Sequence, residues 1–309
     1  MINLFNINNY TIDTSKLTGL HDSIVDRFEK RIAEFTGAKY ACGFNSATNA
    51  IFMALLNKDT TVEVPSILPP VVCNAIKTSG NNISFRDDID WVGDSYILHD
   101  FGDYKIIDSA QKIIKNQFLI EANPQDLMIF SFYPTKPIGS FDGGIIVSND
   151  KEKINFFKMM VMNGCVFDEK SWKRKVIRPG FKMYLNAIQA YIANKNFDKL
   201  NKKYQALEEI RERYNSEFNI KNCSFHLYRL NVNDRQEFIK KAKESKIEIG
   251  IHYESLHNKQ IYSNTKKLLP KSEKESETTI SIPFHENLTE EELQGVIKLV
   301  KTHGYFKNI

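Results

Sequence analysis

The sequence predicts an α/β fold, with a mostly parallel central sheet, helices on both faces and a smaller α+β region behind it. Two observations carry this prediction. Short apolar runs typical of buried strands alternate with helical patterns, which is the order expected of a parallel sheet. The chain of 309 residues is also long enough for one large domain and a smaller one. The expected strands span residues 40–44, 62–65, 83–85, 96–98, 105–108, 127–132 and 144–148.

A long charged helix expected over residues 197–218 leads into the C-terminal region. We therefore divide the chain into a large domain, residues 1–195, and a small domain, residues 196–309. The basic stretch 170–182 is expected to be a loop. Behind the long helix, the pattern predicts a small sheet covered by helices on one side. Its strands and helices are expected at residues 224–232, 235–245, 247–253, 278–282 and 289–302.

The composition argues against several classes of function. The net charge is only +4 and no basic stripe carries interleaved aromatic residues, so nucleic-acid binding is not expected. The first ten residues lack a signal-peptide pattern, and the apolar run at residues 50–56 is too short to cross a bilayer. Scattered cysteines without a CxxC pair favour reduced thiols in a cytoplasmic protein and argue against a zinc site. They are Cys42, Cys73, Cys165 and Cys223.

A turn rich in small polar residues, Asn45-Ser46-Ala47-Thr48, precedes an apolar helix expected over residues 49–57. Free backbone N–H groups and the positive end of the helix dipole suit an anion at such a helix start, and the Thr48 hydroxyl can add a donor. A simpler role for Ser46, as the residue that caps the helix, stays open.

Lys136 precedes Pro137, which disfavours the helical conformation at the lysine and holds it in an extended segment just past a strand. A lysine on such a segment can be aimed at a site. If burial or a nearby cation lowers its pKa, its amine can form a Schiff base with an aldehyde. Taken alone, the position also fits a solvated and inert loop lysine.

Asp108 ends an expected buried strand, where a carboxylate is costly unless it has a partner. Ligands of parallel sheets gather at the carboxyl ends of strands, and Lys136 lies just past another such end. A protonated pyridine nitrogen is one natural partner for Asp108. The pair therefore suggests pyridoxal phosphate (PLP) as the cofactor, although Asp108 would also serve as a helix cap.

Residues near this pair extend the hypothesis. Gln111 can bond the phenolic oxygen of the cofactor, and Ala110 can pack under its ring. Ser131 can reach the phosphate held at the turn, while Gly143-Gly144 lets the chain fold back tightly below the lysine loop.

A metal hydrolase using His252 and His257 is a weaker alternative. The five-residue spacing places the two side chains on opposite faces of a strand, and no carboxylate pattern accompanies them.

Together these segments resemble the DegT/DnrJ/EryC1/StrS family of PLP-dependent nucleotide-sugar aminotransferases, which has the aspartate-aminotransferase-like fold (PLP fold type I). The resemblance runs along nearly the whole chain. The matching segments are Phe35-Thr36-Gly37, the turn at 45–48, Asp108-Ser-Ala-Gln111, Phe130 to Lys136 with Gly143-Gly144, residues 180–190, His252-Tyr253, His257 and Ile282 to His285.

The chain departs from the family pattern at several positions. Ala47 replaces the usual glycine of the phosphate turn. Pro69 stands where the family often places an aromatic residue that stacks on the cofactor. Lys182 and Tyr184 replace the asparagine and arginine of a segment that reaches the partner subunit's site, and Lys182 can still serve a phosphate. Between residues 86 and 98 the chain lacks some dozens of residues usual in the family, so a βα unit is trimmed.

The resemblance implies an aminotransferase reaction. L-Glutamate would give its nitrogen to the cofactor, and a keto-(deoxy)sugar on a nucleotide would accept it, with Lys136 moving the protons. The lysine favours transamination over the family's dehydratase branch, which has histidine there. The resemblance also implies a homodimer with shared active sites, in which Lys182 enters the neighbour's site. The alternative is a catalytically altered binding or regulatory protein on the same fold.

Overall fold

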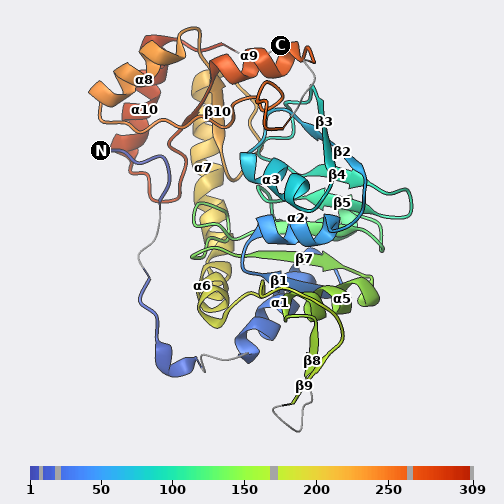
Figure 1. Ribbon diagram of the computed structural model, residues 1–309. Coiled ribbons are helices and arrows are strands. Elements are labelled where there is room, and N and C mark those ends of the chain that lie inside the picture. The colour runs from blue at the N-terminus through green and yellow to red at the C-terminus, as the bar shows by residue number, and fades with distance from the viewer. Residues whose placement is uncertain (7–9, 18–21, 168–172, 263–266, 307–309) are drawn as a thin grey trace.

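The computed structural model describes residues 1–6, 10–17, 22–167, 173–262 and 267–306 (Figure 1). After a 3-10 turn at Thr14–Lys16, the helices are α1 Ser23–Thr36, α2 Ala47–Leu55, α3 Pro70–Thr78, α4 Gln117–Glu121, α5 Lys151–Val161, α6 Ala187–Asp198, α7 Leu200–Phe218, α8 Arg235–Glu244, α9 Pro270–Thr278 and α10 Glu290–His303. The strands are β1 Tyr40–Phe44, β2 Thr61–Pro65, β3 Asn82–Arg86, β4 Tyr96–Asp100, β5 Lys105–Asp108, β6 Leu127–Ser131, β7 Gly144–Ser148, β8 Cys165–Phe167, β9 Arg174–Val176, β10 Tyr228–Asn231 and β11 Thr279–Ile282.

The central sheet has five strands in the order β1-β7-β6-β5-β4. Its β5–β6 pair is parallel, whereas β1–β7, β6–β7 and β4–β5 are antiparallel. The expectation of a mostly parallel sheet is therefore wrong for these strands. Parallel neighbours need a crossover of a dozen or more residues, and the short link from β4 to β5 permits only a hairpin.

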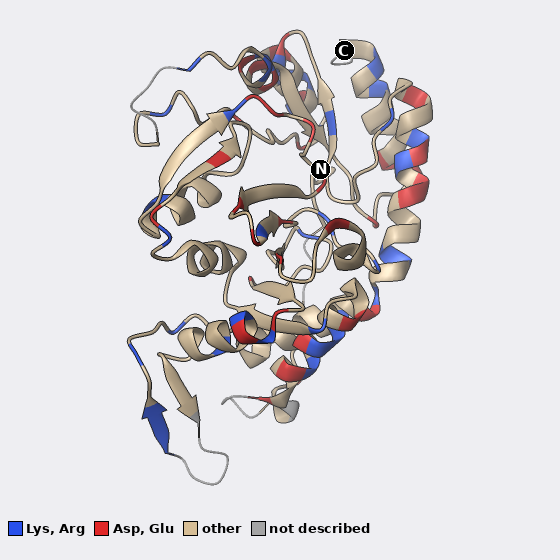
Figure 2. Ribbon diagram, turned by 90° about the vertical axis from the view of Figure 1, so that its right-hand side faces the viewer, with Lys and Arg blue, Asp and Glu red and all other residues tan. Residues whose placement is uncertain are grey.

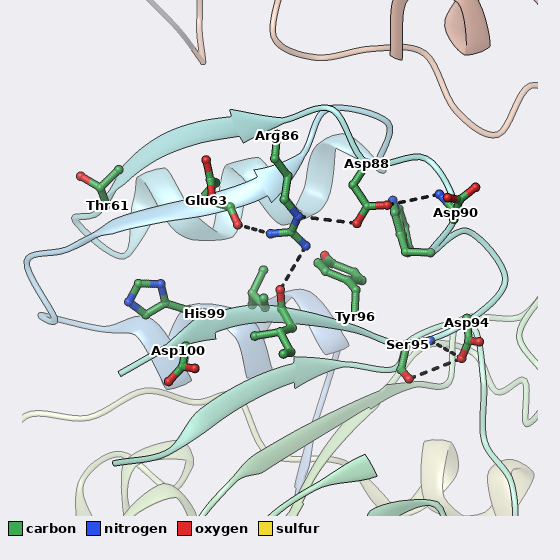
Figure 3. A pocket seen from close by; sticks show the side chains of 13 residues that line it. Thr61, Glu63, Arg86, Asp88, Asp90, Asp94, Ser95, Tyr96, His99 and Asp100 are labelled. Carbon is green, nitrogen blue, oxygen red and sulfur yellow. Dashed lines mark hydrogen bonds and ion pairs between the residues drawn. The ribbon is translucent and has the colours of Figure 1, made fainter. Parts of the chain in front are cut away.

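A separate parallel pair, β2–β3, lies beside β4 without joining its ladder. Arg86, the last residue of β3, crosses the gap. Its Nη1 donates to the Glu63 carbonyl at 2.5 Å and its Nη2 to the Ile97 carbonyl at 3.3 Å. Figure 3 shows this guanidinium between the two parts of the sheet, where it borders a polar hollow of about 720 Å³.

Two apolar cores flank the central sheet. One side of the sheet packs against α2, α3 and α5, and the other against α1 and α6. Helix α2 is apolar nearly all round, so its burial follows from its sequence. These layers hold the ends of β5 and β6 in a fixed relation to each other.

A third core lies in the C-terminal region, where α7, α8 and α10 pack on the β10–β11 pair. The N-terminal residues join it, because the Phe284 N–H donates to the Leu4 carbonyl and Ile2 pairs with Ile247. The division into residues 1–195 and 196–309 stays a proposal, and this separate core supports it.

Several expected elements differ from the structure. Residues 247–253 form no strand and make only isolated bridges, such as Gly250 with Ser281. The stretch expected to be a loop contributes β9, which pairs with β8 and forms a basic strand (Figure 2). Helices α4 and α9 were not expected, because their short or polar sequences show no apolar period. Within the part of the chain that the structure describes, no helix is long and apolar enough to span a membrane.

Candidate active site

The loop between β6 and β7 carries Lys136 and is closed tightly at its base. The Phe132 N–H donates to the Gly143 carbonyl at 2.9 Å, and the Ser140 N–H donates to the Phe132 carbonyl at 2.8 Å. At Gly139 a Cβ atom would lie 2.3 Å from the Pro134 carbonyl oxygen, so only glycine fits there. The loop backbone therefore holds the lysine on a short, fixed segment.

Asp108 ends β5, directly beside β6, and is buried. Its Oδ1 accepts the Ala110 N–H at 2.9 Å, and its Oδ2 accepts the Tyr96 hydroxyl at 2.9 Å. Burial raises the pKa of the Asp108 carboxyl, although both donors and the charge of Lys136 act in the opposite direction. Asp108 is thus a buried acid that depends on its neighbours to stay ionised.

Lys136 and Asp108 are close enough for the charge of each to act on the pKa of the other. Burial of the amine lowers the pKa of Lys136 to about 8, and the Asp108 carboxylate opposes that change. A substantial fraction of the amine is therefore unprotonated at mildly alkaline pH. An unprotonated lysine is the form that attacks a carbonyl carbon.

His226 is a functional candidate that the sequence did not reveal. Its Nε2 lies 3.2 Å from the Lys136 Nζ, and its ring stacks on Phe5 with the centroids 5.9 Å apart. Burial, followed by the charges of Lys136 and His252, holds the pKa of His226 well below its usual range. The neutral ring can therefore accept a hydrogen bond from the lysine ammonium. No spacing in the sequence links a residue 90 positions away to Lys136.

Gln111 lies beside Asp108 but is already held by two protein groups. Its Oε1 accepts the Gly93 N–H at 2.9 Å, and its Nε2 donates to the Tyr253 hydroxyl at 3.2 Å. Tyr253 stacks parallel to Trp91, with the ring centroids 6.5 Å apart. These two hydrogen bonds fix the position of the Gln111 side-chain amide. Its expected bond to a cofactor oxygen stays a prediction.

The turn before α2 meets the strand ends of the lysine loop. The Ser46 hydroxyl accepts the Asn49 N–H at 3.1 Å, which confirms the capping interpretation for Ser46. In the sheet, Gly144 pairs with Ser131. A Cβ atom on Gly144 would lie 2.5 Å from the Ala47 backbone, so the helix start rests directly on this glycine. The arrangement brings Ala47 and Ser131 to the same end of the sheet, with Thr48 in the first turn of α2.

Lys182 precedes Met183, whose carbonyl accepts the Asn45 N–H of the turn at 2.8 Å. It is exposed and pairs with Met162 in an isolated bridge behind the β8–β9 hairpin.

His252 and His257 have separate partners. The Nδ1 of His252 lies 2.9 Å from the Ser281 hydroxyl, while Nδ1 of His257 lies 2.7 Å from the Ser66 hydroxyl. The described residues contain no group of three or more His, Cys, Asp or Glu side chains that could hold a metal ion. Burial lowers the pKa of His252 to about 4.

The fold is of the aspartate-aminotransferase-like α/β class (PLP fold type I), as the sequence predicted. The chain belongs to the DegT/DnrJ/EryC1/StrS aminotransferase family, whose model matches residues 11–88 and 122–301. The unmatched stretch, residues 89–121, contains β4, β5 and Asp108.

Characterised relatives cover most of the chain. It is 26% identical to the UDP-4-amino-4,6-dideoxy-N-acetyl-beta-L-altrosamine transaminase of Campylobacter jejuni, over 85% of each chain. It is 24% identical to the spore coat polysaccharide biosynthesis protein SpsC of Bacillus subtilis, over 90% of this chain and 88% of that one.

Solved structures share the fold. The aminotransferase TlmJ from Streptoalloteichus hindustanus superposes with a TM-score of 0.80 at 18% identity, covering 98% of both chains. Helicobacter pylori PseC, an aminotransferase involved in the biosynthesis of pseudoaminic acid, gives 0.77 at 19% identity, covering 97% of this chain and 99% of that chain. These similarities confirm the predicted fold class.

Proposed function

We propose that this protein is a PLP-dependent aminotransferase that moves the amino group of L-glutamate to a keto-(deoxy)sugar carried on a nucleotide. Glutamate would leave as 2-oxoglutarate, and the keto group would become an amine. The observation that carries the proposal is the placement of two side chains: the buried Asp108 ends β5, and the half-buried Lys136, whose amine is desolvated, lies in the loop that follows the adjacent strand β6. The sugar nucleotide named for the Campylobacter jejuni relative supports the class of acceptor.

The residues of the site fit PLP. A lysine with a pKa lowered to about 8 suits its aldehyde, and a buried carboxylate suits its ring nitrogen. The start of α2, resting on Gly144, offers first-turn N–H groups to its phosphate. When bound, the cofactor supplies an aldehyde that accepts an amine and a ring that stores the electrons of the broken C–H bond.

Each side chain has a distinct task in this proposal. Lys136 would hold the cofactor through its ε-amine and, once released, move the proton to and from the substrate carbon. Asp108 would keep the ring nitrogen protonated. Ser131 and residues 46–48 would bind the phosphate, while Ala110 and Gln111 would pack on and bond the ring.

His226 adds a task to this set. A neutral acceptor 3.2 Å from the lysine would orient the amine while it is protonated. His226 would therefore orient the Lys136 amine both when it holds the cofactor and when it transfers a proton.

We further propose a homodimer whose active sites are completed by the neighbouring copy. Lys182, which is exposed, would reach the partner's site and its phosphate. The free thiols of the chain fit a cytoplasmic setting.

The test is spectroscopic and uses the purified full-length protein. With PLP added, we expect a visible absorption band that borohydride fixes onto Lys136. Adding L-glutamate should then convert the band and release 2-oxoglutarate. The control is Lys30→Ala, which should keep the band, because Lys30 is exposed and forms an ion pair with Glu34 on the same helix.

Two results would contradict the proposal. A protein that takes up no PLP lacks the proposed cofactor. A protein that binds PLP but leaves glutamate unchanged would be the binding or regulatory alternative. Screening nucleotide-linked keto sugars then identifies the acceptor.

A further inference from the structure

The strand beside Asp108 is β4, which is joined to β5 by a hairpin and runs antiparallel to it. Since β4 is antiparallel to β5, its first residue, Tyr96, pairs with Asp108, the last residue of β5. Directly opposite residues of an antiparallel pair project on the same face. The hairpin therefore brings a tyrosine to the acid, and its hydroxyl donates to Asp108 Oδ2 at 2.9 Å.

Tyr96 is held firmly in this position. It is 7% exposed, and its ring lies 4.5 Å from the buried ring of Trp91, centroid to centroid. The Trp91 indole N–H donates to the Ile67 carbonyl at 3.0 Å, which anchors the tryptophan to the loop after β2. The Arg86 guanidinium lies 5.9 Å from the centroid of the Tyr96 ring, and Figure 3 shows the two side chains facing each other. The phenol therefore has little freedom to turn towards water.

The charge state of Asp108 depends on few neighbours. The titratable groups that face it are Lys136 from the lysine loop, Tyr96 from β4 and Tyr253 from the 251–257 segment. Each carboxylate oxygen of Asp108 accepts one hydrogen bond, Oδ2 from the Tyr96 hydroxyl and Oδ1 from the Ala110 N–H. Both bonds favour the ionised carboxylate against the cost of its burial. Burial and the Asp108 charge keep the pKa of the Tyr96 phenol well above its usual range, so it stays a donor.

We propose that Tyr96 is a positioning residue that keeps the Asp108 carboxylate ionised and oriented for the cofactor ring. The inference rests on the proposed function, in which Asp108 binds the ring nitrogen. It assigns a role to the segment between Arg86 and Asp108, where this chain departs from the family pattern. The shortened edge of the sheet supports the acid through a tyrosine.

The experiment compares Tyr96→Phe with Tyr214→Phe in the PLP-loaded protein. Tyr214 is also buried and donates to a carbonyl, that of Pro283 at 3.0 Å, but lies in the C-terminal core. The readout is the pH at which acid removes half of the visible cofactor band. Without its phenol donor, Asp108 protonates at higher pH, so this midpoint should rise by about one pH unit, a tenfold change, in Tyr96→Phe alone.

A double variant tests whether Tyr96→Phe shifts the midpoint through Asp108. In an Asp108→Asn background, Tyr96→Phe should add no further shift, because the carboxylate on which the phenol acts is gone. A midpoint in Tyr96→Phe equal to that of Tyr214→Phe would overturn the inference. A shift that persists in the Asp108→Asn background would overturn it as well.

The inference and the proposed function can fail separately. If the wild type takes up no PLP, the proposed function is wrong. The bond between the two side chains is then tested in the cofactor-free protein by NMR of ¹³C-labelled aspartate carboxyls, with the Asp108 signal assigned by Asp108→Asn. The inference predicts a higher Asp108 pKa in Tyr96→Phe, and an unchanged value contradicts it.

Discussion

The two sides of the active site are built in different ways. On the lysine side, the loop between β6 and β7 lies in the part that the family model matches, and its own backbone hydrogen bonds close it. On the acid side, Asp108 lies in the unmatched stretch, residues 89–121, and the neighbouring strand β4 is antiparallel to β5.

This difference shows which part of the sheet the site needs. Asp108 and Lys136 depend on two adjacent parallel strands, β5 and β6, whose ladder pairs Asp108 with Ile129. That register places the acid and the lysine loop at one end of the sheet. The position of the acid therefore depends on the β5–β6 ladder, whereas the strand on the other side of β5 supplies a hydrogen-bond donor to it.

Lys136→Ala removes the amine on which the lysine side depends and should have the largest effect. Loss of the general acid/base lowers the rate of glutamate conversion by about 10²–10⁴-fold. Borohydride should no longer attach the cofactor to the protein. Lys30→Ala serves as the control, and covalent cofactor in Lys136→Ala would show that another residue holds it.

Asp108→Asn tests the acid side against a matched aspartate, Asp126, which bonds the opposite end of β5. Asp126 is also buried, and its Oδ1 accepts the Lys105 N–H at 2.7 Å. Replacing Asp108 should weaken PLP binding by about 10–100-fold, the value of a hydrogen bond to a charged group. Asp126→Asn should lower the free energy of unfolding but leave the PLP dissociation constant unchanged. Equal PLP dissociation constants for the two variants would show that Asp108 does not bind the cofactor.

His226→Phe sharpens the description of the lysine side. The neutral imidazole favours the protonated amine, so its loss should lower the pKa of Lys136 further below its usual value. The rate of PLP attachment to the cofactor-free protein rises with pH as the amine loses its proton, with a midpoint near 8 in the wild type. We expect that midpoint to fall by about one unit. His303→Phe, at the exposed end of α10, should keep the wild-type midpoint.

Arg86→Leu tests the contact between β4 and the β2–β3 pair and should have the smallest effect. The substitution removes the hydrogen bonds to the Glu63 and Ile97 carbonyls across the gap beside β4. We expect the free energy of unfolding in urea to fall by about 1–2 kcal/mol, with the PLP dissociation constant nearly unchanged. A large loss of PLP affinity would mean that the gap and the acid are coupled more tightly than the ladder suggests.

Much of this site could be predicted from sequence because its parts are local. The strands ending at Asp108 and preceding Lys136, the glycines below the loop and the turn at residues 45–48 each have a short-range pattern. Their order along the chain also resembles that of the family. These features determined the fold class and the acid–lysine pair.

The direction of β4 and the contacts between distant side chains at the site arise from tertiary packing and could not be predicted from the sequence. An apolar alternation is the same in both strand directions, so the pattern at Tyr96 could not show that β4 is antiparallel to β5. His226 reaches Lys136 from 90 residues away, a contact set by the packing of the C-terminal region and carried by no sequence period. Strand and helix periods arise from neighbouring residues, whereas these contacts arise from how finished elements pack.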